Sequence, residues 1–168
     1  MFGLKGSLSG SFVNCKYLWS IVIPNGVITL SQTFNNCDRL SNVELPSTLT
    51  TITSYAFRNN YALHNITLPN SLTTIGTQAF QGSRLVSVTI PSSVTSIESY
   101  AFDNISSLTE IICLGTVPPS ISSTRPFGQT NQTFPIYVPD DSVAAYKSKD
   151  GFSQYANRIK GISERPTQ

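Results

Sequence analysis

The chain has 168 residues, enough for one domain or for one segment of a longer, elongated protein. Hydrophobic residues make up 39% of it and charged residues only 12%, about half of the usual share of roughly 25%. The net charge of +2 is small and the Lys and Arg residues are scattered, which argues against binding to nucleic acid or to an anionic membrane.

The chain starts with a partial repeat, residues 1–11. Leu8 lies one repeat length before Leu30 and in phase with it, so residues 8–12 correspond to the end of a coil whose strand is missing. No polar cap of the kind that ends a repeat array is visible there. The sequence therefore predicts a piece of a longer array, or an end-to-end contact with a partner through this uncapped coil.

Repeats of 22 or 23 residues follow, up to residue 114. This period lies in the range typical of leucine-rich repeats. In each, a phenylalanine precedes a leucine that opens an L-x-x-[IV]-x-[IL] unit, although the fifth copy has Cys113 in the last slot. A proline follows the unit in four copies, and a second apolar pair such as Leu49 and Ile52 comes next. The repeats start near the phenylalanines Phe12, Phe34, Phe57, Phe80 and Phe102.

The pattern within each repeat predicts its structure. The alternation x-[IV]-x-[IL] is typical of a short, half-buried strand, and the proline, which cannot donate to a ladder, ends it. A single repeat buries too little apolar surface to offset the cost of ordering its backbone, so neighbouring repeats must stack. We expect a right-handed solenoid of leucine-rich repeats, with short parallel strands stacked as one sheet and with coils made mostly of β structure and loops.

Two of the three cysteines occupy the position three residues after the phenylalanine. Asn60, Ser83 and Ile105 fill the same position in later repeats, and this slot is expected to hold a small polar residue that bonds the backbone of the next coil. A disulfide between Cys15 and Cys37, one repeat apart, is geometrically conceivable but is not expected.

The repeat resembles the leucine-rich repeats of the BspA type, whose pattern is close to A-F-x-x-C-x-x-L-x-x-[IV]-x-[IL]-P-x-x-[VL]-T-x-I. Residues 50–57 and 95–102 match it closely, and the resemblance covers about residues 8–160. It implies the leucine-rich-repeat fold. It also implies an association with bacterial and protist surface proteins that adhere to host or matrix proteins, although a fold does not determine a function.

The pattern changes after residue 114. Residues 115–135 are predicted to be a loop, and Ile136-Tyr137-Val138-Pro139 restores the strand-plus-proline signature. Asp140 or Asp141 is expected to cap a helix through Ser142–Lys149, and a second short helix is expected over Phe152–Lys160. Residues 136–163 thus predict a capping strand with a small helical cap, similar to the cap of the same family, and residues 164–168 form a tail.

Residue patterns typical of catalysis are missing from the sequence. There is no nucleophile elbow, phosphate-binding loop or zinc-protease motif, and the single His64 has no matched carboxylate or nucleophile. Helix capping explains Asp140 and Asp141 better than a calcium site or an acid pair does. We therefore expect no catalytic, metal-binding or cofactor-binding residues.

The outward strand positions are the candidate binding face, because in a solenoid they pave one continuous surface. Most of these hydroxyl and amide side chains could equally serve only to connect the coils, but Trp19 is large enough to anchor an interface. Alternatively, Trp19 packs on a coil that precedes it. The candidate residues are Trp19, Ser20, Val22, Asn42, Glu44, His64, Asn65, Thr67, Ser87, Thr89, Glu110 and Ile112.

The leading hypothesis is a non-enzymatic binding or adhesion module that recognises a protein, located outside the cell or on its surface. The alternative is an intracellular, cytoplasmic protein–protein scaffold of the same fold, and a carbohydrate-binding or hydrolytic role is a third. No apolar stretch is long enough to cross a bilayer, and residues 1–11 lack the apolar core of a signal peptide. Three N-x-[ST] sites, at Asn65, Asn104 and Asn131, would matter only in a eukaryotic secretory pathway.

Overall fold

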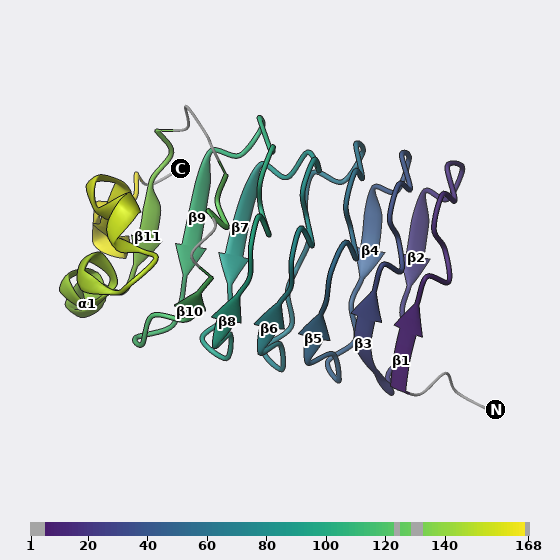
Figure 1. Ribbon diagram of the computed structural model, residues 1–168, viewed down its shortest axis with the longest axis horizontal. Coiled ribbons are helices and arrows are strands. Elements are labelled where there is room, and N and C mark those ends of the chain that lie inside the picture. Colours follow the sequence, from purple (N-terminus) through teal and green to yellow (C-terminus); the bar gives the residue numbers. More distant parts are fainter. Residues whose placement is uncertain (1–5, 123–124, 129–132, 167–168) are drawn as a thin grey trace.

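The computed structural model describes residues 6–122, 125–128 and 133–166. The chain winds into coils that stack along one axis, from strand β1 (Gly6–Ser9) at one end to helix α1 (Val143–Ser148) at the other (Figure 1). Within this part of the chain every strand pairs in parallel with its counterpart in an adjacent coil. The predicted leucine-rich-repeat solenoid is therefore confirmed, as is a helical segment at its C-terminal end.

One side of the coils carries a six-stranded sheet built from the second apolar pair of each repeat. Leu30, Ile52 and Ile75 pair in register from coil to coil, and their side chains are fully buried. Leu8 pairs with Leu30, as their phase in the sequence predicts. The strands, in spatial order, are β1, β3 (Val27–Ser31), β5 (Thr51–Ile52), β6 (Thr74–Ile75), β8 (Ser96–Ile97) and β10 (Ser120–Ile121).

The opposite side carries the L-x-x-[IV]-x-[IL] units, which form two separate sheets. The two-stranded sheet consists of β2 (Ser20–Val22) and β4 (Asn42–Glu44). The four-stranded sheet has the order β12 (Ile159–Gly161), β11 (Ile136–Val138), β9 (Glu110–Cys113) and β7 (Ser87–Ile90).

The expectation of a single sheet is wrong in two respects. Strands form on both sides of each coil, because the second apolar pair, whose residues are three positions apart, also pairs in register with its own copy in the next coil. We number the coils by their phenylalanines, so that the first coil contains Phe12 and the third contains Phe57. On the side of the L-x-x-[IV]-x-[IL] units, residues 65–68 of the third coil form no strand, which leaves a gap in the ladder between β4 and β7 (Figure 1).

The phenylalanines form one stack through the core. Neighbouring rings from Phe12 to Phe102 have centroids 5.3–5.4 Å apart and are inclined by only 3–19°. Phe127 continues the stack at 6.1 Å from Phe102, and Phe152 lies 6.0 Å from Phe127. The segment 115–135, predicted to be a loop, therefore adds a further ring to the core and contains strand β10, which pairs with β8.

The slot three residues after the phenylalanine bonds the backbone of the preceding coil at Cys37 and Asn60, and not that of the next coil as expected, whereas the buried hydroxyl of Ser83 has no partner among the described residues. The Sγ of Cys37 donates to the carbonyl oxygen of Phe12 at 3.0 Å, and the Nδ2 of Asn60 donates to that of Phe34 at the same distance. In both cases the partner belongs to the preceding coil. The thiols of Cys15, Cys37 and Cys113 are free.

The C-terminal cap differs in detail from the prediction. The first helix is a 3-10 turn, η1 (Asp140–Ser142), followed by α1, and no side chain caps either of them. The expected cap by Asp140 is wrong, because its Oδ1 instead accepts bonds from the backbone N–H and the hydroxyl of Ser163. The second predicted helix is the 3-10 helix η2 (Ser153–Arg158), which gives way to β12 and then to η3 (Ile162–Glu164).

The cap closes the core with aromatic side chains. Tyr146 from α1 is buried, its ring packs edge-on against Phe152, and its hydroxyl donates to the carbonyl oxygen of Gly115 at 2.9 Å. Tyr155 packs edge-on against Phe127. At the other end of the stack Phe12 and Leu18 are only half-buried, whereas their counterparts in inner coils are fully buried.

Candidate functional site

The candidate binding face begins with exposed apolar side chains at the N-terminal end. Trp19 is 69% exposed and Val22, on β2, is 64% exposed. Next to them the polar columns bond from coil to coil: the Nδ2 of Asn42 donates to the Oγ of Ser20, and the Oγ of Ser41 donates to the Trp19 carbonyl oxygen. These bonds connect β2 and β4 while Asn42 and Glu44 stay exposed.

The C-terminal cap occupies the other end of this face. The guanidinium of Arg165 forms two bonds with the carboxylate of Glu110, at 2.6 and 2.9 Å, and this pairing raises the pKa of the arginine. Ile112, two residues further along β9, is half-buried. Glu110 is therefore engaged within the chain, and the freely exposed part of the face spans the first four coils.

The third coil, whose residues 65–68 form no strand, lies in the middle of the face. His64 is exposed and its Nδ1 lies 2.7 Å from the carbonyl oxygen of Ala62. Asn65 and Thr67 are exposed, and Ile66 is half-buried, whereas its counterpart Val88 in β7 is buried. The third coil thus sits less deeply on the core than the strand beside it.

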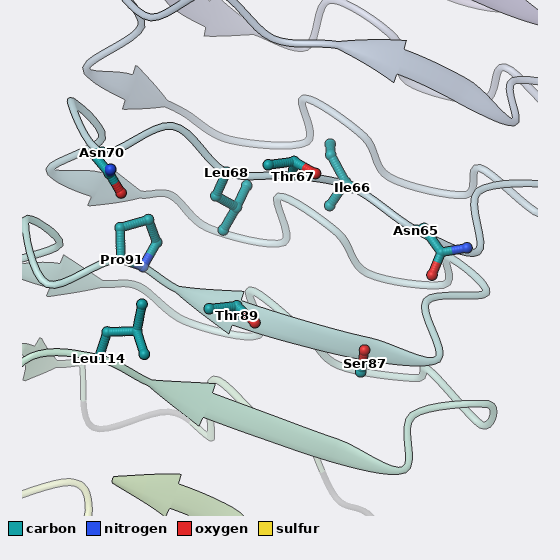
Figure 2. A pocket seen from close by; sticks show the side chains of 9 residues that line it. All are labelled: Asn65, Ile66, Thr67, Leu68, Asn70, Ser87, Thr89, Pro91 and Leu114. Carbon is teal, nitrogen blue, oxygen red and sulfur yellow. The ribbon is translucent and has the colours of Figure 1, made fainter. Parts of the chain in front are cut away.

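A groove of about 280 Å³ lies between the third and fourth coils (Figure 2). Amides and hydroxyls and a few apolar side chains share its lining, and the lining carries no charged side chain. The lining residues are Asn65, Ile66, Thr67, Leu68, Asn70, Ser87, Thr89, Pro91 and Leu114.

A second groove, of about 590 Å³, lies on the other side of the third coil, between it and the second coil. It shares Thr67 and Asn70 with the first groove, and Glu44 lies at its edge on β4. Candidate residues Asn42, Asn65, Ser87 and Thr89 thus line one or the other groove.

The sequence analysis missed Asn70, Leu68, Pro91 and Leu114 as lining residues. The repeat motif predicts Leu68 as a core residue and Pro91 as the end of a strand, because it gives only the inward or outward direction of a strand residue. The signal that could have found Asn70 is its place directly after the proline, where the outward columns of two coils meet at the strand ends.

The buried thiols are poorly suited to nucleophilic chemistry. Burial raises the pKa of Cys37 to about 11 and that of Cys113 to about 12, so neither is a thiolate at neutral pH. No group of three or more His, Cys, Asp or Glu residues that could hold a metal ion occurs in the described ranges. We find no arrangement of a nucleophile, a base and an orienting group on the described face.

The three thiols should react at very different rates with a thiol-specific reagent. Cys15 is half-exposed, whereas Cys37 and Cys113 are buried and protonated, so we expect only Cys15 to be alkylated in the folded protein. Mass spectrometry after timed exposure to iodoacetamide measures this, and a fully denatured sample in which all three sites react is the control. Equal labelling of Cys37 and Cys15 in the folded chain would contradict the burial seen here.

Two of the three N-x-[ST] sites are accessible. Asn65 and Asn104 are both exposed, and Asn104 lies in a turn with a positive φ of 54°. Asn131 lies outside the described residues. Accessibility alone assigns no modification to either site.

A comparison with protein families identifies the repeat. The model of the BspA type leucine rich repeat region matches residues 8–124 in six copies. The chain belongs to this family. No protein in the comparison with curated proteins matches this BspA-type chain.

Solved structures similar to this BspA-type chain are leucine-rich-repeat proteins. A leucine-rich-repeat protein of T. pallidum has a TM-score of 0.66 at 23% identity, over 96% of this chain and 81% of the other. The pneumococcal vaccine antigen PcpA has a TM-score of 0.62 at 22% identity, over 83% of this chain and 40% of the other. A leucine-rich-repeat protein of Bacteroides ovatus gives 0.57 at 20%, over 84% and 45%.

These likenesses show the fold alone, because the identities are low. The chain spans less than half of the B. ovatus protein and of PcpA. Within its described part, the chain contains no helix that combines the length and the apolar character needed to cross a membrane.

Proposed function

We propose that this chain is a non-enzymatic module that binds a protein through the exposed face of its first four coils. The observation that carries the proposal is the juxtaposition of the exposed Trp19 and Val22 with the polar side chains of strands β2 and β4, of which only Glu44 is charged. Interfaces combine aromatic anchors with a polar rim, and charged residues are depleted at their centres. Membership of the BspA-type family and the repeat architecture support it.

A finer part of the proposal is adhesion to a host or matrix protein from outside the cell or from its surface. The membership of the BspA-type family supports this. The alternative is an intracellular scaffold of the same fold. Fractionation of the source cells distinguishes them, because a purely cytosolic chain would rule out adhesion.

The first coil supports a second contact surface. Phe12 and Leu18 are half-buried there, although the side chains in the same positions of inner coils are fully or almost fully buried. End-to-end contact with another protein surface would cover them. This contact is independent of the face proposed above, because it involves the end of the stack.

The face proposal is tested by substituting its anchor. Trp19→Ser removes a side chain that is 69% exposed, so we expect folding to be unchanged and the affinity for a protein ligand to fall more than about tenfold. The ligand is first identified by screening the chain against immobilised matrix, serum and cell-surface proteins, and the affinity is measured by surface plasmon resonance.

The matched control is Tyr61→Ser, which removes another exposed aromatic side chain, 52% exposed, from a turn away from the strands. Its affinity should equal that of the unmodified chain. A ligand whose binding responds to Tyr61→Ser and not to Trp19→Ser would place the interface elsewhere and overturn the proposal.

A further inference from the structure

The coils bring together basic residues that are scattered in the sequence. Residues 6–122 contain four Lys and Arg residues, and each lies in the turn between the phenylalanine and the leucine of a different coil, from the first to the fourth. These turns line up along one edge of the stack, the upper edge in Figure 1. We call this the basic edge, and it consists of residues 13–17, 35–39, 58–62 and 81–84. Its cations are Lys16, Arg39, Arg58 and Arg84.

The positive charge of the basic edge is not neutralised within the chain. Asp38 is the one carboxylate in these four turns, so four positive charges stand against one negative charge. Among the described residues the ion pair is that of Arg165 with Glu110, near the other end of the stack, and none of the four cations takes part in it. The edge therefore carries more positive charge than the whole chain, whose net charge is +2.

The four cations lie close enough together to act as one field. Neighbouring coils are 5.3–5.4 Å apart at their stacked rings, so the edge spans roughly 16 Å along the stack. The Debye length is about 8 Å at physiological ionic strength, so the potentials of cations on adjacent coils add. An approaching molecule thus meets a continuous positive edge.

Two of the arginines are held by aromatic rings, and two are exposed. The guanidinium of Arg39 lies 5.5 Å from the centre of the Tyr17 ring in the preceding coil, and that of Arg58 lies 5.5 Å from the centre of the Tyr55 ring. Arg58 is half-buried, whereas Arg39 and Arg84 are exposed. The charges of Arg39 and Arg84 are therefore available to a partner.

The basic edge adjoins the candidate binding face. Arg39 and Arg84 each come directly before the inward leucine of their coil, and the residue directly after that leucine belongs to the column of Trp19. The backbone N–H of Ser41 donates to the carbonyl oxygen of Trp19 at 3.0 Å, which places Arg39 one coil along from the tryptophan. Because a standard interface covers about 800 Å² on each partner, a protein seated on Trp19 would extend over the edge.

We propose that the protein partner is acidic where it covers the basic edge, so that its Asp and Glu carboxylates pair with Arg39 and Arg84 while an apolar group covers Trp19. The inference rests on the proposed function and names the chemistry of the partner. Complementary charges at the rim of an interface speed association and select the partner more than they add affinity. The edge thus steers an acidic protein onto the apolar anchor.

The density of charge favours a protein over a polyanion. Duplex DNA carries one charge per about 1.7 Å, roughly nine along the length of the edge, whereas the edge offers four cations. Polyanions also offer few aliphatic groups to cover the exposed Val22, which lies on the face with Trp19. A folded protein presents a few carboxylates beside apolar groups, and this combination matches the edge and the face together.

The edge is tested by removing its two exposed arginine charges. Arg39→Gln/Arg84→Gln should leave the fold intact, and its matched control is Lys147→Gln/Lys160→Gln, which removes two exposed charges from the cap and gives the same net charge. The probes are immobilised poly-L-glutamate, heparin and a DNA duplex, measured by surface plasmon resonance at about 50 mM salt, where screening is weak. We expect the binding of poly-L-glutamate to fall at least about fivefold for the edge variant and less than about twofold for the control.

The protein ligand found by screening matrix, serum and cell-surface proteins is the second probe. Its association rate at low salt should fall at least about fivefold for the edge variant, and its dissociation rate should change less than about twofold, because rim charges act on association. Raising the salt concentration should slow association with the unmodified chain more than with the edge variant. Tyr61→Ser changes no charge on the same edge and should leave both rates unchanged.

The outcomes separate this inference from the proposed function. If the protein ligand is lost with Trp19→Ser but its association responds neither to salt nor to the edge variant, the face binds protein and the inference alone fails. If heparin or DNA binds through Arg39 and Arg84 and poly-L-glutamate does not, the edge serves a polyanion and the inference is wrong. If no protein responds to Trp19→Ser, the proposed function fails and the inference falls with it, even where poly-L-glutamate binds through the edge.

Discussion

Phe80→Ala should lower the free energy of unfolding by about 3–5 kcal/mol, the cost expected for truncating a fully buried phenylalanine. Phe80 is fully buried, and its ring lies 5.3 Å from both Phe57 and Phe102, inclined by only 3° and 5°. Removing it leaves a cavity between two rings that the coil spacing holds in place. Because stacked coils depend on their neighbours, the loss is felt across the interface of three repeats.

Urea denaturation followed by circular dichroism measures this loss, and Phe12→Ala is the matched control. Among the described residues, Phe12 is half-buried at the end of the stack and has one ring neighbour, Phe34, at 5.4 Å. Its substitution should cost clearly less than that of Phe80. Equal effects at the two positions would mean that the stack does not stabilise the inner coils more than the end coil.

The phenylalanine column shows how far the sequence predicts this fold. A nearly constant spacing predicts five rings in register, and all five stack. The spacing does not predict Phe127, because its separation from Phe102 exceeds the repeat period. The longer coil nevertheless completes a turn and places the ring of Phe127 on the stack. A periodicity detects equal coil lengths, whereas stacking needs only that each coil return to the same place.

The interruption of the sheet could not be predicted from the repeat motif. Residues 63–68 match L-x-x-[IV]-x-[IL] as well as residues 85–90 do, yet only the latter contain a strand. The motif specifies which side chains face the core, and Leu63 and Leu68 are indeed buried. It does not specify the distance between neighbouring backbones, on which ladder hydrogen bonds depend.

The sequence also could not predict that Glu110 forms an ion pair within the chain. Its partner Arg165 lies far along the chain, in a segment assigned to the tail, and no local pattern connects the two. Long-range pairs of this kind follow from where the cap places the chain, which is a property of the folded cap. The outward direction of Glu110 was predicted, but its availability to a ligand was not.

Gly76→Ala should lower the free energy of unfolding by about 1–3 kcal/mol, the cost of inserting a methyl group into a packed site. The φ of Gly76 is not positive, so without a clash the change would be mildly stabilising, by about 0.4–1 kcal/mol. A steric clash of the added methyl group therefore makes the change in the free energy of unfolding a loss. An added Cβ would lie 2.7 Å from the Cα and C atoms of Thr53, which are backbone atoms of the preceding coil and are held by ladder bonds on both sides.

Gly161→Ala is the matched control, because it also lacks a positive φ but meets a different obstacle. There the added methyl group would meet the carboxylate of Asp140, which is exposed and can rotate away at the loss of its bonds to Ser163. We therefore expect Gly161→Ala to cost less than Gly76→Ala in the same urea titration. If Gly76→Ala stabilised the chain, the second and third coils would have to be able to separate at Thr53. The six-stranded sheet would then be a flexible contact between coils, and the gap on the opposite side would lose the rigid frame that fixes its length.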